Sequence, residues 1–367
     1  FMDMGYPGDP IKRHEREENI PDVILYTSGT TAKPKGVMLE ENQFDANGSG
    51  FLEHLHFSPE DRVILALPLF HSYGNIIALV LLRSGATLIL LKQFQPKTIL
   101  ASITQHKATI LPLVPTIYSF LVELYARGGD DVSSLRYCIS GGASLPEALL
   151  KKVEEGLGVT VIEGYGLTET SPAIAVNTMK YGSVPGSVGP ILPNVELDIV
   201  DDAGKPIAQG EVGEIRVRGE TVMKGYWNKP DETAETLSAD GWLKTGDMAV
   251  ISEDGYMKIV DRKKDMIIVS GFNVYPNEVE DVVVSHPDIM EAAAIGVPDA
   301  KSSEAVKVFV VSKNENLTAA EIKDFCRERL TGYKVPRHIE FRDELPKTNV
   351  GKILRRELRD EELAKQS

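Results

Sequence analysis

The first half of the chain alternates short apolar stretches with segments of helical pattern. The apolar stretches are rich in β-branched residues, as buried strands are, and they occupy residues 23–25, 63–66, 87–91, 109–113, 137–139 and 159–162. Segments 96–106, 115–125 and 146–155 begin at or near a proline, which is tolerated in the first helical turn because its missing N–H needs no partner there. This alternation predicts βα units and a sheet covered by helices.

After about residue 183 the pattern changes to short strands separated by turns. Turn signals at residues 201–204, 209–210, 240–241 and 254–255 predict a β-rich region. A dense charge cluster follows at residues 261–265, where we expect a hinge, although such a run taken alone is typical of an exposed surface. Beyond it we expect strands at 266–270, 292–296 and 305–312, with helices at 276–285 and 318–330.

These patterns predict an α/β protein of two domains. The large domain occupies residues 1–260 and consists of a layered α/β part, 1–182, and a β-rich part, 183–260. Residues 261–265 are the hinge, and residues 266–367 form a small, mobile α+β domain. Two domains fit a chain of 367 residues, because single hydrophobic cores stop growing below that length. The chain begins with Phe1 rather than Met, so we expect it to start inside a longer protein.

Composition and charge exclude several classes of protein. Hydrophobic residues at 42% and charged residues at 26% are ordinary for a globular protein. A formal charge of −14 disfavours nucleic acid as a partner. Cys138 and Cys326 have neither disulfide nor zinc-ligand spacing, which favours the cytoplasm. The apolar stretch 76–82 is typical of a buried helix and is far too short to span a bilayer. Peripheral contact with a membrane stays open. The sequence does not indicate the oligomeric state.

The run from Tyr26 to Gly36 has the composition of a polyphosphate-binding loop. After a strand it supplies four hydroxyl groups, the flexible Gly29 and two ammonium groups, on Thr27, Ser28, Thr30, Thr31, Lys33 and Lys35. Its spacing matches neither the Walker A loop nor the GxGxxG fingerprint. The alternative interpretation is a polar surface turn.

This run resembles the phosphate-loop signature of the acyl-adenylate-forming superfamily, which comprises acyl-CoA synthetases, luciferases and peptide-synthetase adenylation domains. Ala32 stands where that signature usually has glycine, so we expect altered loop motion rather than loss of binding. Further segments of the superfamily follow in the right order across nearly the whole chain. The resemblance implies an adenylate-forming ligase fold whose large domain lacks part of its usual N-terminal portion.

Two of these segments line the acid pocket in the superfamily. In Pro68–Gly74, the resemblance implies that His71 gates or orients the substrate carboxylate, although a core histidine fits equally well. Peptide-synthetase domains usually carry aspartate at this place, so His71 argues against an amino acid substrate. In residues 140–144, Gly141, Gly142 and Ala143 would let the backbone approach adenine and the acyl group closely.

The segment Glu163–Thr170 resembles the part that contacts the nucleotide. The resemblance implies that Glu163, Gly164, Tyr165 and Gly166 contact the nucleotide, with Tyr165 stacking on adenine, and that Thr168 meets the α-phosphate. Glu169 would hold Mg²⁺, which is commonly bound by one or two carboxylates together with substrate phosphates. The alternative for Glu169 is a solvated loop carboxylate.

Two later segments complete the expected nucleotide site. In residues 242–247 the resemblance implies that Asp247 accepts from the ribose hydroxyls. In residues 261–265 it implies that Arg262 contacts the nucleotide and that Lys264 is the hinge residue.

The segment 346–353 resembles the loop whose lysine enters the site during acyl-AMP formation. Lys352 is therefore the expected catalytic residue. Attack of a carboxylate on a phosphate brings two anions together, so an ammonium group near both lowers the barrier. A thiol must later reach the same place, and in the superfamily the C-terminal domain rotates to allow this. Gly271, in residues 269–274, would then border the channel for coenzyme A.

The resemblance is strongest to fatty acyl-CoA synthetases. It predicts an enzyme that uses a fatty acid, ATP, Mg²⁺ and coenzyme A. An aryl-CoA ligase and a fatty acyl-AMP ligase serving a carrier protein are the nearest alternatives. A nucleotide-binding fragment without turnover is an alternative of a different class, because the usual N-terminal portion is short here.

Overall fold

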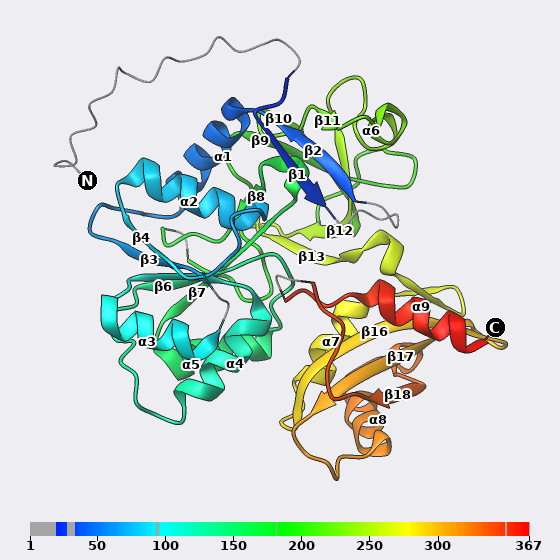
Figure 1. Ribbon diagram of the computed structural model, residues 1–367. Coiled ribbons are helices and arrows are strands. Elements are labelled where there is room, and N and C mark those ends of the chain that lie inside the picture. The colour runs from blue at the N-terminus through cyan, green and yellow to red at the C-terminus, as the bar shows by residue number, and fades with distance from the viewer. Residues whose placement is uncertain (1–19, 28–33, 93–94, 181, 349–350, 367) are drawn as a thin grey trace, which may run out of the picture.

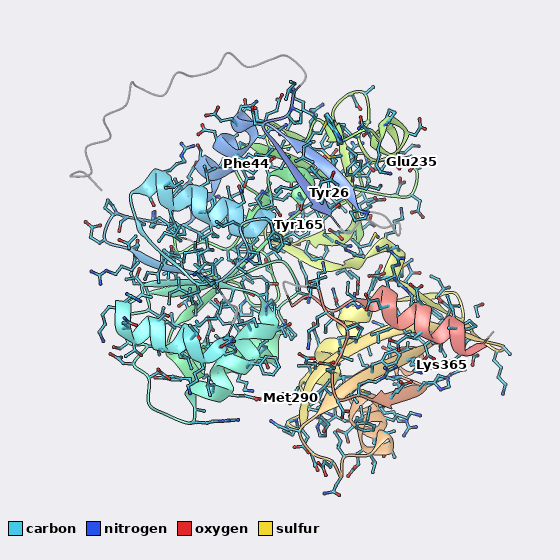
Figure 2. The ribbon with its side chains drawn as sticks, in the orientation of Figure 1. Tyr26, Phe44, Tyr165, Glu235, Met290 and Lys365 are labelled. Atoms are coloured by element: carbon cyan, nitrogen blue, oxygen red, sulfur yellow. The ribbon has the colours of Figure 1, made fainter. Side chains whose placement is uncertain are left out.

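The computed structural model describes residues 20–27, 34–92, 95–180, 182–348 and 351–366. The chain forms a large domain and a smaller C-terminal domain that lie side by side (Figure 1). Figure 2 labels Tyr165 in the large domain, whereas Met290 and Lys365 belong to the smaller one.

A six-stranded sheet forms the centre of the large domain, in the order β4-β3-β5-β6-β7-β8. Its strands are parallel except for β8, and helices cover both faces, with α1 and α2 on one side and α3, α4 and α5 on the other (Figure 1). The strands are β3 (Arg62–Leu65), β4 (Thr87–Leu90), β5 (Ile110–Leu113), β6 (Tyr137–Ser140), β7 (Thr160–Gly166) and β8 (Ala173–Val176). The helices are α1 (Glu41–His54), α2 (Ser72–Ser84), α3 (Pro96–His106), α4 (Pro115–Tyr125) and α5 (Glu147–Leu157). The predicted βα units are confirmed.

The first strand is not part of this sheet, so one expectation was wrong. β1 (Val23–Thr27) pairs antiparallel with β2 (Lys35–Leu39), and β2 pairs with β11 (Gly225–Tyr226) from the β-rich part. The connection between β1 and β2 spans only residues 28–34, whereas a parallel crossover needs a dozen residues or more. A short loop therefore dictates a hairpin and carries β1 into a different sheet.

The β-rich part forms a four-stranded antiparallel sheet in the order β13-β12-β10-β9. Its strands are β9 (Val195–Val200), β10 (Gly213–Gly219), β12 (Leu243–Ile251) and β13 (Met257–Arg262), and α6 (Pro230–Thr236) precedes β12. The short turns η1 (Thr168–Thr170) and η2 (Lys263–Asp265) follow β7 and β13.

The C-terminal domain packs three helices on one sheet, ordered β15-β14-β17-β16 with β18 parallel to β17. Its elements are β14 (Ile267–Val269), β15 (Phe272–Val274), α7 (Pro276–Val284), β16 (Ile289–Asp299), β17 (Ser303–Ser312), α8 (Ala319–Arg327), η3 (Gly332–Lys334), β18 (His338–Phe341) and α9 (Arg355–Gln366). Each predicted strand and helix of this region is present. The patterns did not predict α9, which is strongly polar and buries Leu358.

Each domain has its own hydrophobic core. The large-domain core extends along the chain to Met257, and the cores of the C-terminal domain begin at Ile267. The chain passes from one core to the other through residues 258–266, which include the proposed hinge.

Candidate active site

The proposed phosphate loop connects β1 to β2, and most of it lies outside the described residues. This applies to Ser28, Gly29, Thr30, Thr31, Ala32 and Lys33. The flanking residues are described: Thr27 ends β1 and pairs across the hairpin with Lys35. The buried Thr27 hydroxyl has no hydrogen-bond partner in the part of the chain that the structure describes.

Lys35 and Glu169 come together through a tyrosine that the sequence analysis missed. The Lys35 side chain is only 7% exposed, and its Nζ lies 4.6 Å from the centroid of the Tyr226 ring. The hydroxyl of Tyr226 donates a hydrogen bond of 2.9 Å to Oε1 of Glu169. Tyr226 stands in a two-residue strand without a recognisable phosphate-binding pattern, so no sequence signal pointed to it.

His71 is half-buried and caps a helix. It is the N-cap of α2, and its Nδ1 accepts a hydrogen bond of 3.2 Å from the backbone N–H of Tyr73. Burial lowers the pKa of His71, and the Lys352 ammonium lowers it further. The imidazole is therefore neutral near pH 7, with its proton on Nε2, where it can donate to an oxygen of a substrate. Next to it, Ser72 Oγ lies 3.2 Å from Thr168 Oγ1, which brings Thr168 to the same helix start.

The small-residue turn after β6 is supported by Glu163. Gly141, Gly142 and Ala143 lie in this turn, and Gly142 has a φ of 80°, which favours glycine. The backbone N–H of Leu145 donates a 3.1 Å hydrogen bond to Oε1 of Glu163. Burial raises the pKa of Glu163 to about 8. In the structure, the Glu163 side chain supports this turn through its hydrogen bond with Leu145.

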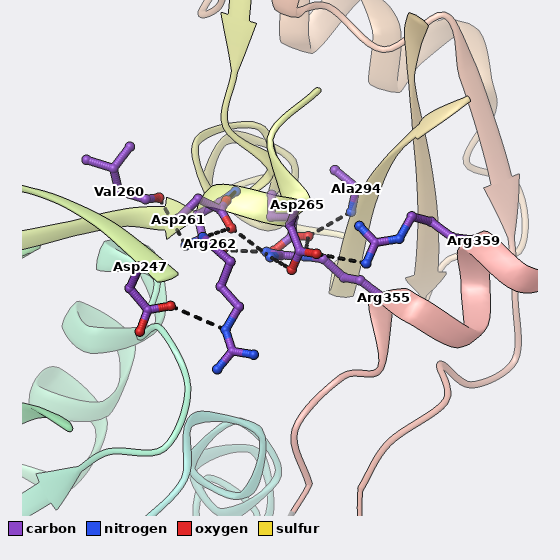
Figure 3. A network of polar contacts seen from close by, with 10 residues as sticks. Asp247, Val260, Asp261, Arg262, Asp265, Ala294, Arg355 and Arg359 are labelled. Carbon is purple, nitrogen blue, oxygen red and sulfur yellow. Dashed lines mark hydrogen bonds and ion pairs between the residues drawn. The ribbon is translucent and has the colours of Figure 1, made fainter. Parts of the chain in front are cut away.

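Tyr165, Asp247 and Arg262 form a chain of polar contacts. Tyr165, which follows Gly164 on β7, donates a 2.6 Å hydrogen bond to Oδ2 of Asp247. Arg262 Nε lies 3.3 Å from the other carboxylate oxygen, Oδ1, as Figure 3 shows. Gly166 ends β7, where an added Cβ would lie 2.0 Å from the carbonyl oxygen of Pro172. The backbone turn itself therefore requires glycine at this position.

Lys352 reaches the large domain on a loop from the C-terminal domain. The Thr116 hydroxyl at the start of α4 donates a 2.9 Å hydrogen bond to the carbonyl oxygen of Gly351, which docks this loop. Burial lowers the pKa of Lys352 to about 8; the positive charge of Arg262 acts in the same direction, and Asp247 opposes it. Lys352 thus lies close enough to Arg262, Asp247 and His71 for the charges to act on one another.

The acidic residues of the charge cluster 261–265 are buried, so the alternative interpretation as an exposed run fails for them. Asp261 is 1% exposed and Asp265 8% exposed. Arg355, at the start of α9, lies 3.0 Å from Oδ1 of Asp261 and donates from Nε to Glu280 on α7 at 2.8 Å. Arg359 pairs with Asp265 at 2.8 Å (Figure 3). The carboxylates are stabilised by arginines that come about 90 residues later, which periodicity cannot reveal.

The structure does not place Gly271 among these residues. It lies in the turn between β14 and β15 with a φ of 83°, and an added Cβ would meet no described atom within 4 Å. Its expected contact with coenzyme A stays a prediction.

Glu169 fits a Mg²⁺ ion that is held partly by substrate. Within the described residues, no group of three or more histidine, cysteine, aspartate or glutamate side chains is arranged to hold a metal ion. Tyr226 occupies Oε1 of Glu169, and the structure gives Oε2 no hydrogen bond to another described residue. One oriented carboxylate beside a phosphate site suits Mg²⁺, which keeps water and phosphate oxygens as its other ligands.

Comparisons with known proteins agree with the resemblance found in the sequence and with the fold. The AMP-binding enzyme family matches residues 6–227, and the AMP-binding enzyme C-terminal domain matches residues 278–352. A long-chain-fatty-acid–CoA ligase of Escherichia coli O157:H7 is 42% identical over 361 residues, which cover 95% of this chain and 64% of the relative. The chain thus spans slightly less than two thirds of the length of this curated relative.

A feruloyl-CoA synthase of Amycolatopsis is 38% identical and covers 92% of this chain, which spans 69% of that relative. The crystal structure of ATP-bound MatB from Rhodopseudomonas palustris superposes with a TM-score of 0.86 at 36% identity, covering 92% of this chain and 67% of MatB. In the described residues, none of the helices is long and apolar enough to cross a membrane.

Proposed function

Because this chain belongs to the family of AMP-binding enzymes, we propose that it carries the catalytic residues of an ATP-dependent fatty acid–CoA ligase. In the first reaction, a fatty acid and ATP give acyl-AMP and pyrophosphate. In the second, the thiol of coenzyme A displaces AMP and gives acyl-CoA. The observation that carries the proposal is the docking of the Lys352 loop on α4 of the large domain through Thr116, which brings the Lys352 ammonium within electrostatic reach of Asp247, Arg262 and His71.

The first reaction needs positive charge where two anions meet. The substrate carboxylate is already ionised, so it attacks the α-phosphorus without a general base. The Lys352 ammonium stabilises the charge that is shared between the carboxylate and the α-phosphate. Lys35 binds the β- and γ-phosphates, which leave as pyrophosphate, and Thr168 donates to the α-phosphate. Mg²⁺, when bound, neutralises phosphate charge, and Glu169 would hold it.

Asp247 is suited to the ribose of the nucleotide. Its side chain is 6% exposed, and both carboxylate oxygens are held, one by Tyr165 and one by Arg262. A carboxylate offers about four acceptor positions, so two fixed contacts leave positions for the ribose hydroxyls. The same contacts orient Tyr165 and Arg262 toward the nucleotide.

The second reaction requires that Lys352 leave. Its loop is docked on the large domain through Thr116. The loop itself belongs to the C-terminal domain, whose hydrophobic cores are separate from that of the large domain. Rotation about residues 261–265 would remove Lys352 and bring the turn with Gly271 to the acyl-AMP. The open surroundings of Gly271 are consistent with a contact made only after rotation.

The acid is a fatty acid or, as the second candidate, an aromatic acid. The neutral His71 can donate a hydrogen bond to the carboxyl group of either one. The long-chain-fatty-acid–CoA ligases support the first candidate, and the feruloyl-CoA synthase supports the second. We place the reaction in the cytoplasm, because Cys138 and Cys326 are both buried and unpaired, as in proteins of reducing compartments.

The test measures AMP and CoA thioester formation from ATP, Mg²⁺ and a panel of fatty, aryl and amino acids. We expect fatty acyl-CoA from the unmodified chain and a rate of formation that is about 10²- to 10³-fold lower from Lys352→Ala. Lys313→Ala is the matched control, because Lys313 is an exposed lysine of the same domain. ATP binding without pyrophosphate release from any acid would instead support a nucleotide-binding fragment.

A further inference from the structure

Tyr226 contacts two oppositely charged groups of the proposed site. The phenol is 6% exposed; its hydroxyl donates to Glu169 Oε1 at 2.9 Å, and its ring lies 4.6 Å from the Lys35 ammonium. That distance is within the range of a cation–π interaction, which strengthens when the cation is desolvated, as Lys35 is. One buried side chain therefore contacts both the candidate Mg²⁺ ligand and the phosphate-binding lysine.

The hydrogen bond determines how the Glu169 carboxylate is presented. A phenol can donate one proton, and here it occupies one carboxylate oxygen. Among the described residues, Tyr226 is the only one whose side chain hydrogen-bonds to this carboxylate. With Oε1 held, rotation of the carboxylate is restricted and Oε2 is left for a cation. Without the hydroxyl, both oxygens would be free to turn.

The backbone around Tyr226 fixes the two segments that it connects. Residue 226 pairs with Val37 on β2, and the N–H of Trp227 donates to the Gly36 carbonyl oxygen at 2.7 Å. Three residues earlier, the N–H of Met223 donates to the carbonyl oxygen of Glu169 at 2.9 Å. Residues 223–227 thus hold the backbone of both segments, and the Tyr226 side chain then sets the positions of their charged ends.

We propose that Tyr226 is a positioning residue, which orients Glu169 for Mg²⁺ and Lys35 for the polyphosphate. This inference rests on the proposed function. It assigns Tyr226 a role that acts through other residues and involves no contact with the reacting atoms. Groups held in advance in the productive geometry bind more tightly, because less ordering is required when the ligand arrives.

The test is Tyr226→Phe, which keeps the ring beside Lys35 and removes only the hydroxyl. Calorimetry measures the affinity for ATP at a series of Mg²⁺ concentrations, and ATP–pyrophosphate exchange measures the reaction. We expect the Mg²⁺ concentration for half-maximal effect to rise by about tenfold in both assays, as loss of a hydrogen bond to a charged group permits. Affinity for ATP in EDTA should stay unchanged.

Two further variants separate positioning from a general loss of stability. Tyr137→Phe also removes a buried hydroxyl, which donates to the His56 carbonyl oxygen at 3.3 Å outside the site, and it should leave the Mg²⁺ dependence unchanged. In a Glu169→Gln background, Tyr226→Phe should have no further effect on Mg²⁺, because Tyr226 acts through that carboxylate.

The other possible results distinguish failure of this inference about Tyr226 from failure of the proposed function. ATP binding with an unaltered Mg²⁺ dependence in Tyr226→Phe would overturn this inference and leave the proposed function intact. The inference would also be overturned if Tyr226→Phe changed the Mg²⁺ dependence as much in the Glu169→Gln background as in the unmodified chain. If the unmodified chain bound no ATP, the proposed function would fail, and the inference with it.

Discussion

The two lysines of the site, Lys35 and Lys352, are held in different ways. Lys35 starts a strand of the large domain, and its ammonium group lies over the ring of Tyr226. Lys352 lies on a loop of the C-terminal domain that is docked by the hydrogen bond from Thr116 to Gly351. Just after that loop, Arg355 is held by the ion pairs to Asp261 and Glu280.

This difference suits the two reactions. A lysine fixed by strand pairing keeps its place, because moving it would break a ladder of backbone hydrogen bonds. A lysine on a docked loop can leave when one hydrogen bond and a few side-chain contacts exchange. We therefore assign Lys35 to a fixed place in the polyphosphate site and Lys352 to a place that it occupies in the first reaction alone.

The largest expected effect comes from the network that supports the Lys352 loop. Arg355→Met leaves the carboxylates of Asp261 and Glu280 without their cation, so the free energy of unfolding of the C-terminal domain should fall by about 3–5 kcal/mol. Urea denaturation measures it. The control is Arg356→Met, because Arg356 is 44% exposed and pairs only at 3.5 Å with Asp360, so its loss should cost below about 0.5 kcal/mol. Equal losses in both variants would contradict the assigned role of the network.

The next effect separates the two lysines directly. Lys352→Ala should lower the rate of acyl-AMP formation by about 10²- to 10³-fold, as removal of one transition-state stabilising group does, with little change in the affinity for ATP. Lys35→Ala should weaken ATP binding itself. Single-turnover kinetics and calorimetry measure the two quantities. The comparison breaks down if both variants lose ATP affinity to the same extent.

The pH dependence should identify Lys352 as the group that limits activity in base. Its pKa is lowered to about 8 by burial, so the ammonium is present below that pH and is lost above it. We expect kcat/KM for acyl-AMP formation to fall about tenfold per pH unit above about 8. Arginine keeps its proton in this range, so the decline should be absent from the residual activity of Lys352→Arg. A decline that persists there would assign it to a different group.

The smallest effect concerns a contact within the large domain. Ser72→Ala removes the partner of the Thr168 hydroxyl, and loss of one neutral hydrogen bond costs about 1 kcal/mol, or about a fivefold loss in kcat/KM for ATP. Ser134→Ala is the control, because the Ser134 hydroxyl donates to the Ala108 carbonyl oxygen outside the site. An effect as large as that of Lys352→Ala would mean that Ser72 acts on the reacting atoms.

The sequence by itself predicted many of the elements and proposed the residues that carry the chemistry. Helices α3 and α4 begin and end where the pattern placed them, because proline at the start and apolar periodicity are local signals. The order of the family segments brought Tyr165, Asp247, Arg262 and Lys352 together as candidates before their geometry was known. Gly271 was a candidate too, and its contact with coenzyme A stays a prediction, because the structure gives its position no close neighbour among the described residues.

Only the tertiary structure decided how those residues are held. The β1–β2 hairpin joins a strand from the β-rich part, Tyr226 reaches Glu169 across 57 positions, and Arg355 reaches Asp261 across 94. The sequence next to a charged or aromatic residue does not identify its contact partner, since such a side chain can be solvated or buried. Its environment is set by segments far along the chain, and the fold alone determines which of them it meets.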